Sequence, residues 1–472
     1  MPVPADILAS LETEVARSVS FWRRLTAPQL LVGSFFGLVV LGTVLLLFLP
    51  GIYTGERLRF VDALFTATSA VCVTGLIVVD TATYFTPFGQ AVLLFLIQLG
   101  GLGILSLTTL LILAMGRRLS LRSEQLAGAT EGLPYIEPRS LVRTLVAYTF
   151  ITEAIGAVAL YAAWAPRLGV QEALWPALFH AISAFCNAGF SIFSDNIVGF
   201  SGHVPTLLVL AVLIVIGGLG SVVLTELRLR LGPGTGRRTR LSVHTRIVLT
   251  TTAVLIVGAT FLFLLLEWRN ALADHALPGR FAEALFMAIT PRTAGFNTAE
   301  YALLTPGSLF MTIGLMMIGG SPGSMAGGLK TTTFALLGLL AYSRIRGYEH
   351  TGAFRRTIPD ETFQRAVGLV VAVMGMLGGV ILLLLLTEFG TTPYSETGAG
   401  FMQLTFEAVS AFNTVGLSTG ITPSLSTPGK ILIVLLMFIG RVGPLTFVAA
   451  MVVASRRTGV RVRHSTEDVV IG

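Results

Sequence analysis

The sequence predicts an all-α membrane protein with eight transmembrane helices in four similar repeats. Composition is the first observation: 53% of the 472 residues are hydrophobic, 12% are charged, and the mean hydropathy is +0.80. These values exclude an ordinary soluble protein with a polar surface. The second observation is a phrase that recurs four times, as ALFTATSAVCVTGL, ALFHAISAFCNAGF, ALFMAITPRTAGF and LTFEAVSAFNTVGL. The third is the pair of long apolar runs that encloses each phrase.

Each repeat opens and closes with an apolar run that is long enough to span a bilayer. The opening runs cover roughly 27–50, 140–165, 246–267 and 365–389, and the closing runs cover roughly 87–115, 204–227, 306–343 and 428–455. All exceed the roughly 20 residues that a helix needs to cross about 30 Å of hydrocarbon. The repeats therefore occupy 27–118, 139–231, 245–345 and 363–457, between an amphipathic lead-in at 1–26 and a tail at 458–472.

The recurring phrase lies between the two runs of each repeat. Its apolar part is only about 10 to 12 residues long, too short to cross, so it is expected to dip into the bilayer and return. Such irregular backbone is tolerated only beside protein or a water-filled cavity. The pore loops are thus expected at 63–77, 177–191, 284–297 and 404–418. Four of them predict pseudo-fourfold symmetry around a central pore.

Each phrase breaks at one glycine, and these glycines follow one another at steps of 114, 106 and 121 residues. One glycine after an apolar helix is usually a helix C-cap, but four at matched positions favour a shared function. Glycine can adopt the left-handed conformation that points a carbonyl inward, and a ring of carbonyls can replace the water around a monovalent cation. The expected filter lining is Val73, Thr74, Gly75, Asn187, Ala188, Gly189, Thr293, Ala294, Gly295, Thr414, Val415 and Gly416.

The basic residues alternate between loops. Of 32 lysines and arginines, 23 lie in the two termini and every second loop, including the terminal RRTGVRVR, and six lie in the opposite loops. The positive-inside rule therefore predicts that both termini are cytoplasmic. Because the charge is explained by topology, the pI near 9.8 does not indicate a nucleic-acid partner. The basic loops are expected to bind a cytoplasmic partner or anionic membrane lipid.

The third closing run is interrupted by MIGGSPGSMAGGLKTTT, residues 317–333. A proline among several glycines cannot continue a helix. We expect a flexible gating loop below the pore loops, anchored by a lysine at its cytoplasmic end, and the other three repeats lack such a loop. The expected gate residues are Gly319, Gly320, Ser321, Pro322, Gly323, Ser324, Gly327, Gly328 and Lys330.

A glycine motif recurs in the second helices, as IQLGGLG, IVIGGLG, MMIGGSPG and MFIGRVG. Such glycine pairs permit close packing of helices or a local break, and close packing is the favoured interpretation for Gly100, Gly101, Gly217 and Gly218. In the fourth repeat Arg441 replaces the second glycine of the pair. Two interpretations are open: Arg441 is a positive barrier in the pore, or it forms a buried ion pair with Glu153 or Glu226.

Several other polar residues have two readings. Acids and amides follow the first three glycine loops on the outward side: Asp80, Asp195, Asn196, Asn297 and Glu300. They either raise the local cation concentration or cap loops. Asp62, Glu283 and Glu407 are expected to satisfy amides in the half-helices. No nucleotide-binding, hydrolase or metal-binding motif occurs in the sequence, so we expect neither an enzyme nor a bound cofactor.

These motifs together resemble a known family. The phrases TATSAVCVTGL, HAISAFCNAGFSIFSDN, TPRTAGFNT and FEAVSAFNTVGLS, the loop GGSPGSMAGGLKTTT and Arg441 resemble the Trk/Ktr/HKT superfamily of cation transporters. The membrane subunit of bacterial Ktr potassium uptake systems is the most similar member, over nearly the whole chain. The resemblance implies a filter at the four glycines, and a gate at 317–333 with Arg441. It also implies a homodimer with one pore per subunit, docked on a cytoplasmic ring of regulatory nucleotide-binding subunits.

The resemblance further implies potassium uptake across a bacterial cell membrane. Gly75 favours K⁺ as the substrate, because some plant relatives with sodium preference have serine there. Two alternatives stay open. One is a secondary cation transporter in which Na⁺ is a coupling or activating ion. The other is a Trk-type subunit with weaker potassium selectivity, since each loop has one glycine where tetrameric potassium channels have two.

Overall fold

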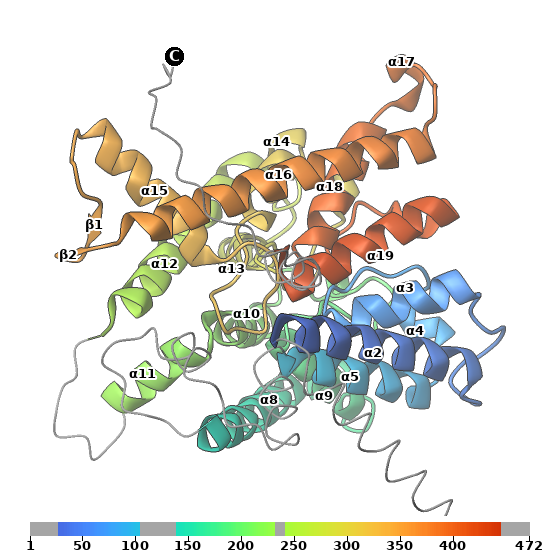
Figure 1. The fold of residues 1–472 in the computed structure, drawn as a ribbon. Helices are drawn as coiled ribbons and strands as arrows, with labels where there is room; N and C mark the ends of the chain where they lie inside the picture. The colour runs from blue at the N-terminus through green and yellow to red at the C-terminus, as the bar shows by residue number, and fades with distance from the viewer. Residues whose placement is uncertain (1–26, 104–137, 232–240, 445–472) are drawn as a thin grey trace, which may run out of the picture.

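The computed structural model describes residues 27–103, 138–231 and 241–444. These residues are mostly helical (Figure 1). The expected lead-in at 1–26, the tail at 458–472 and the ends of the first and fourth repeats lie outside the described residues.

The helices follow the order expected for each repeat. The first helices are α2 (Ala27–Phe48), α8 (Pro138–Leu168), α12 (Val243–Glu267) and α16 (Asp360–Glu388). The half-helices of the recurring phrase are α3 (Phe60–Val71), α9 (Leu174–Phe185), α13 (Leu277–Ile289) and α18 (Gly400–Phe412). The second helices are α5 (Pro87–Gly101), α10 (Val204–Leu219) with α11 (Ser221–Leu231), α14 (Pro306–Met316) with α15 (Thr331–Ile345), and α19 (Thr427–Val442).

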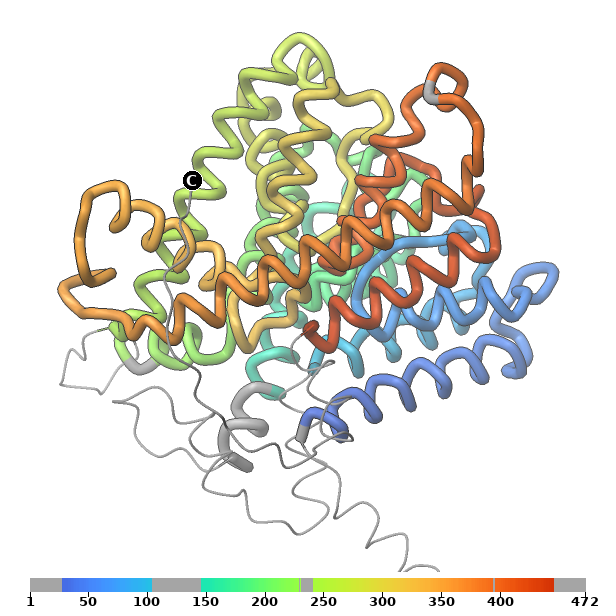
Figure 2. Tube along the Cα trace, turned by 45° about the horizontal axis from the view of Figure 1, so that its top comes forward, coloured from blue at the N-terminus to red at the C-terminus, as the bar shows by residue number. Residues whose placement is uncertain are grey.

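The remaining elements are short. They are α4 (Thr81–Tyr84), α17 (Tyr394–Thr397), three 3₁₀ turns (Val198–Phe200, Tyr301–Leu303 and Thr422–Ser424) and an antiparallel hairpin of β1 (Gly352–Ala353) and β2 (Arg356–Thr357). The hairpin and α15 project from one side of the molecule. Helix α16 leads from the hairpin to α17 on the opposite side (Figures 1 and 2).

The expected eight continuous spans are only partly present among the described residues. Four helices are long and apolar enough to cross a membrane, at Pro28–Phe48, Val146–Leu168, Val243–Glu267 and Asp360–Glu388. The run at 204–227 is not one helix: α10 and α11 meet at an angle of 101°. Gly220 between them has φ +87°, a left-handed conformation that ends the helix.

The second helix of the second repeat is also interrupted, at Gly220 between α10 and α11, which corrects the expectation that a break belongs to the third repeat alone. The last glycine of the recurring glycine motif has a positive φ each time: Gly103 +60°, Gly220 +87°, Gly323 +70° and Gly443 +90°. The third repeat differs by the length of the break, because its two helices are separated by residues 317–330. The loop is therefore three residues shorter than the predicted 317–333.

The start of a second helix is marked by the same local chemistry in three repeats. Thr86, Thr305 and Ser426 each stand at an N-cap, with proline in the first turn. Each hydroxyl accepts a hydrogen bond from the backbone N–H three residues on, at 3.1 to 3.3 Å. The cap satisfies a free amide and proline fits the first turn, so these segments begin helices where the sequence turns back into the bilayer.

The four repeats contact one another in a closed cycle. Within a repeat the half-helix packs against the first helix, as α3 does against α2. Between repeats each second helix packs against the next half-helix: α5 on α9, α10 on α13, α14 on α18, and α19 on α3. The third residue of each phrase (Phe65, Phe179, Phe286 and Phe406) is fully buried in the core around the half-helices. The repeated sequence thus marks repeated packing.

Candidate ion pathway

The four glycine loops share an unusual backbone conformation. Each filter glycine has a positive φ: Gly75 +91°, Gly189 +68°, Gly295 +76° and Gly416 +91°. The residue two positions earlier is also left-handed, although it is not glycine: Val73 +56°, Asn187 +59°, Thr293 +72° and Thr414 +49°. A β-branched residue in this region is strained, and such strain persists only where the surrounding structure enforces it. Three of the four residues are β-branched, and the same left-handed conformation at four matched positions points to a functional constraint.

The structure brings the four glycines together in a ring. A β-carbon placed on Gly189 would lie 2.8 Å from the Ala294 carbonyl oxygen and 2.9 Å from the Cα atom of Gly295. The same construction at the other three glycines overlaps a carbonyl oxygen of the neighbouring loop: Ala188 for Gly75, Val415 for Gly295 and Thr74 for Gly416. Each glycine therefore faces the carbonyl that precedes the next glycine, and any side chain would displace it.

A layer of hydroxyl residues holds these loops from behind. The backbone N–H groups of Thr74, Ala188, Ala294 and Val415 donate to the carbonyls of Ser69, Ser183, Thr290 and Ser410, at 2.7 to 3.0 Å. The side chains of Ser69 and Ser410 also accept from the filter glycines at 3.1 Å, whereas those of Ser183 and Thr290 donate to Phe190 and Phe296 carbonyls. Sequence reasoning missed this layer, although a serine or threonine occupies the seventh position of every phrase.

The loop at 317–330 is hydrogen-bonded to the broken end of α10 and to α19. Ser321 and Met325 donate their N–H groups to the carbonyls of Gly218 (3.0 Å) and Gly217 (3.2 Å). In return Ser221, the first residue of α11, donates to the Gly323 carbonyl at 3.0 Å. Gly328 donates to the Gly440 carbonyl of α19 at 3.3 Å. The exposed backbone groups at the helix breaks are thus satisfied by the loop itself.

The loop also lies against the fourth glycine loop. A β-carbon on Gly327 would overlap the Thr414 hydroxyl, and one on Gly328 would overlap the Asn413 side chain. The Asn413 side-chain oxygen accepts from the Leu329 N–H at 3.3 Å. The glycines of the loop therefore allow close approach to residues that directly precede a filter position.

Arg441 is buried, with 3% of its surface exposed, and it donates to two backbone carbonyls. One belongs to Gly100 of α5, at 2.5 Å, and the other to Met325 of the loop. Lys330 donates to the next loop carbonyl, that of Ala326, at 2.8 Å. Two cationic side chains thus hold consecutive carbonyls of one loop. The Lys330 side chain therefore bonds within its own loop, to a carbonyl four residues earlier.

The alternative of a buried ion pair for Arg441 is wrong. The Glu153 carboxylate accepts from Gln98 at 3.3 Å and from the Cys186 thiol at 3.8 Å. Glu226 accepts from the Ser242 N–H at 3.0 Å. Among the described residues only Arg365 and Lys430 form salt bridges, so the Arg441 charge is balanced by carbonyl dipoles.

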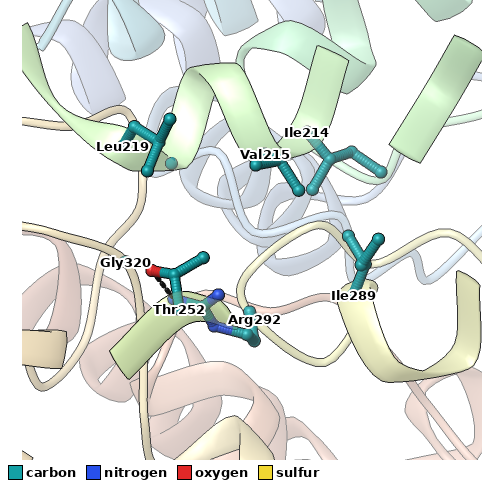
Figure 3. A pocket seen from close by; sticks show the side chains of 8 residues that line it. Ile214, Val215, Leu219, Thr252, Ile289, Arg292 and Gly320 are labelled. Carbon is teal, nitrogen blue, oxygen red and sulfur yellow. Dashed lines mark hydrogen bonds between the residues drawn. The ribbon is translucent and has the colours of Figure 1, made fainter. Parts of the chain in front are cut away.

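A second buried arginine connects the third glycine loop to the 317–330 loop. Arg292, 9% exposed, directly precedes the left-handed Thr293. It donates to the hydroxyls of Thr252 (3.3 Å) and Thr331 (3.4 Å). Thr331 in turn donates to the Gly319 carbonyl at 2.8 Å. Arg292 lines a small cavity between α10, α12 and the loop, with Ile214, Leu219 and Gly320 among its neighbours (Figure 3).

The outward acids cap loops rather than face one another. Asp80 accepts from Ala82 N–H (3.0 Å) and from the Ser194 hydroxyl (2.7 Å), and Asp195 accepts from Gly199 N–H (2.7 Å). Within the described ranges no group of three or more histidine, cysteine, aspartate or glutamate side chains is placed to bind a metal.

The acids of the half-helices do not satisfy first-turn amides as expected. Instead each one joins separate segments. Asp62 pairs with Lys430 of α19 at 2.8 Å, Glu283 accepts from the Gly202 N–H at 3.1 Å, and Glu407 accepts from the hydroxyls of Ser418 (2.8 Å) and Thr422. The partners of Asp62 and Glu283 lie far from them along the chain, and those of Glu407 lie in the loop after its own half-helix, where no sequence pattern marks them.

Comparison with known proteins identifies the family. The family model described as "TrkH: Cation transport protein" matches residues 20–457. The chain belongs to the TrkH family. Its members are cation transport proteins rather than enzymes, and this TrkH-family chain is a helical membrane protein with several apolar spans.

Three curated relatives align with this TrkH-family chain over nearly their whole length. The potassium/sodium uptake protein NtpJ of Enterococcus hirae is 35% identical over 95% of this chain and 98% of its own. Ktr system potassium uptake protein B of Bacillus subtilis is 39% identical over 90% and 93%, and its namesake from Vibrio alginolyticus is 39% identical over 89% and 90%. Among solved structures, the potassium transporter TrkH from Vibrio parahaemolyticus has a similar fold, with a TM-score of 0.67, 19% identity, and coverage of 89% and 83%.

Proposed function

We propose that this chain carries K⁺ into the bacterial cell through the ring of four glycine loops. In this proposal the four repeats, with eight helices that cross the bilayer, surround a central pore with pseudo-fourfold symmetry. The observation that carries it is the closed cycle in which each filter glycine faces the carbonyl before the next. The carbonyls of Thr74, Ala188, Ala294 and Val415 would replace the water of a dehydrated cation. The names of the curated relatives favour potassium.

The gate in this proposal is the 317–330 loop with Arg441 and Lys330. Its support is the set of hydrogen bonds that fixes the loop to α10 and α19 and holds it against the residues before Thr414. The buried Arg441 beside the loop and the half-buried Lys330 at its end would repel a cation that leaves the filter, because charges interact strongly where little water is present. For ions to pass, the loop must release the Gly217, Gly218 and Gly440 carbonyls and move aside.

A sodium-linked transporter is the second candidate. It is favoured by the name of the E. hirae relative, which is described as a potassium/sodium uptake protein. A single glycine in each loop fits the other alternative, a Trk-type subunit with weaker discrimination between the two ions.

Ion flux into liposomes tests both candidates. Purified full-length protein is reconstituted, and K⁺ and Na⁺ uptake are measured under opposed gradients of each ion. A K⁺-selective pore predicts K⁺ flux that needs no Na⁺, whereas a coupled transporter predicts K⁺ accumulation that stops when the Na⁺ gradient is removed. Equal flux of K⁺ and Na⁺ without coupling would support the remaining alternative, a Trk-type subunit of weak selectivity. No cation flux in any condition would overturn the proposal.

We further propose that the chain forms a homodimer on a cytoplasmic ring of nucleotide-binding subunits, with both termini in the cytoplasm. The term "Ktr system" in the relatives' names supports a multi-subunit assembly. The exposed Arg355 and Arg356 of the hairpin region offer a charged surface on the inward side, and the terminal RRTGVRVR lies outside the described residues. Changing both arginines to glutamine should weaken co-purification of the partner, whereas the same change at the outward Arg269 should not.

A further inference from the structure

Asn196 lies seven residues after the second filter glycine, in the outward loop that follows it. Its φ is +61°, in the left-handed region that asparagine tolerates better than most residues other than glycine. Neither the cap interactions of Asp195 nor the filter geometry described above makes use of its side chain. The conformation nevertheless turns this side chain toward the ring.

The Asn196 amide joins two of the four glycine loops. Its nitrogen donates to the carbonyl of Gly189 at 3.3 Å, and its oxygen accepts from the backbone N–H of Asn297 at 3.2 Å. A backbone N–H can only donate, so the contact with Asn297 fixes which amide atom is the oxygen. The nitrogen must therefore face Gly189. Asn297 stands two residues after Gly295, so the bridge joins the second loop to the third.

The position of this bridge is itself held in place. The Ser191 hydroxyl donates to the Asn196 carbonyl at 2.9 Å, and the Ile197 N–H donates to the Asn297 carbonyl at 3.1 Å. Three hydrogen bonds besides the one to Gly189 thus keep the amide where it is. A donor that is fixed in this way restrains the carbonyl it binds.

The bridge makes the ring unequal. Within residues 27–103, 138–231 and 241–444, no side chain or N–H group donates to the carbonyls of Gly75, Gly295 or Gly416. Gly189 also has the smallest φ of the four, +68° against +76° and +91°. One of the four glycine carbonyls therefore has a donor of its own, and three are left free.

We propose that Asn196 is a positioning residue that sets the discrimination between K⁺ and Na⁺. The inference rests on the proposed filter function. A carbonyl that is held by a fixed donor cannot move inward to surround a smaller ion, and its lone pair is partly occupied. Loss of the donor lets the Gly189 oxygen approach Na⁺ more closely. The ratio of the two ion affinities changes, while the fold is kept.

Two substitutions separate this role from a structural one. Asn196→Gly removes the amide but keeps the left-handed backbone without strain. Asn196→Asp keeps an oxygen for the Asn297 N–H and removes the donor to Gly189. An added carboxylate attracts a smaller ion more strongly at close range, so the uncharged Asn196→Gly is the variant that separates loss of the donor from the added charge. Phe354→Gly is the matched control, because Phe354 is also left-handed (+53°) but lies by the distant hairpin.

The measurement is the ratio of half-saturating K⁺ and Na⁺ concentrations for uptake by proteoliposomes, with the melting temperature as the check of folding. Both Asn196 variants should lower the preference for K⁺ by about three- to tenfold, the value of one hydrogen bond. Phe354→Gly should leave it unchanged. Gly75→Ser serves as the test of the filter itself.

The outcomes are distinct. If both Asn196 variants stay within twofold of the wild-type ratio while Gly75→Ser lowers it, the role of Asn196 is overturned and the filter stands. If Gly75→Ser also leaves the ratio unchanged, the filter assignment fails together with the inference. A lower ratio in Asn196→Asp alone would trace the effect to the carboxylate and would also count against the proposed role.

Discussion

The ring of glycine loops repeats the same local structure four times, whereas the layer around the 317–330 loop differs from one repeat to the next. In the ring, each of the four loops has two residues with left-handed backbone, a serine or threonine behind them, and the same contact with the next loop. In the layer around the 317–330 loop the matching glycine has a positive φ in all four repeats, but the third repeat has a long loop between its two helices and the second has a bend of 101°. Arg441 occurs in one repeat only. Repetition suits a task that four segments share equally, and divergence suits a task assigned to one.

The largest expected effect tests whether the four repeated glycine loops act as the ion filter. Gly75→Ser places a side chain on the Ala188 carbonyl and forces a serine into φ +91°. We expect the preference for K⁺ over Na⁺ uptake to fall by more than about tenfold, because the cost of the left-handed backbone adds to the effect of the displaced carbonyl. Gly51→Ser is the control, because Gly51 has φ +77° but open space around it. Equal losses in both variants would show that strain alone, and not the ring, is responsible.

The next effect tests whether Arg441 and the 317–330 loop act as a gate. Arg441→Ala removes the two hydrogen bonds that join the loop to α5 and α19. Because the loop loses a charged partner, we expect K⁺ flux in liposomes to rise by about tenfold and the dependence on a regulatory partner to fall. Lys430→Gln, on the same helix at its outward end, should leave flux unchanged. Wild-type flux in the Arg441 variant would refute a gating role.

A smaller effect addresses the connection between the two layers. Thr331→Val removes the hydroxyl that joins Arg292 to the Gly319 carbonyl, with little change in shape. The loop should open more readily, with flux higher by about threefold, the value of a modest hydrogen bond. Thr332→Val, the adjacent residue, is the matched control. If the two variants behave alike, the Arg292 contact does not couple the loop to the ring.

The smallest effect concerns the outer mouth. Asp195 accepts from the Gly199 N–H, and asparagine retains an oxygen for that bond. Asp195→Asn should therefore shift the half-saturating K⁺ concentration by less than about twofold, even at low ionic strength where surface charge acts most strongly. A larger shift that disappears in high salt would restore the alternative that this acid concentrates cations.

The parts of the fold that depend on local sequence were predictable. The first helices and the half-helices lie within a few residues of their expected bounds, because length, hydropathy and capping residues determine them. The break at Gly220 was one of two interpretations of the glycine motif, since a glycine in an apolar run is compatible with a continuous helix or with a break until its φ is known. The partners of Arg441 and Glu407 were missed because neither a backbone carbonyl nor a hydroxyl in the following loop leaves a pattern in the sequence.

The contact of α19 with α3 has a consequence for biosynthesis. Asp62 and Lys430, which pair across this contact, are separated by 368 positions along the chain. During synthesis the first three repeats enter the membrane before the fourth exists, and their carbonyls then face a gap. The cycle of contacts between second helices and half-helices therefore closes only when the last repeat is inserted and α19 reaches α3.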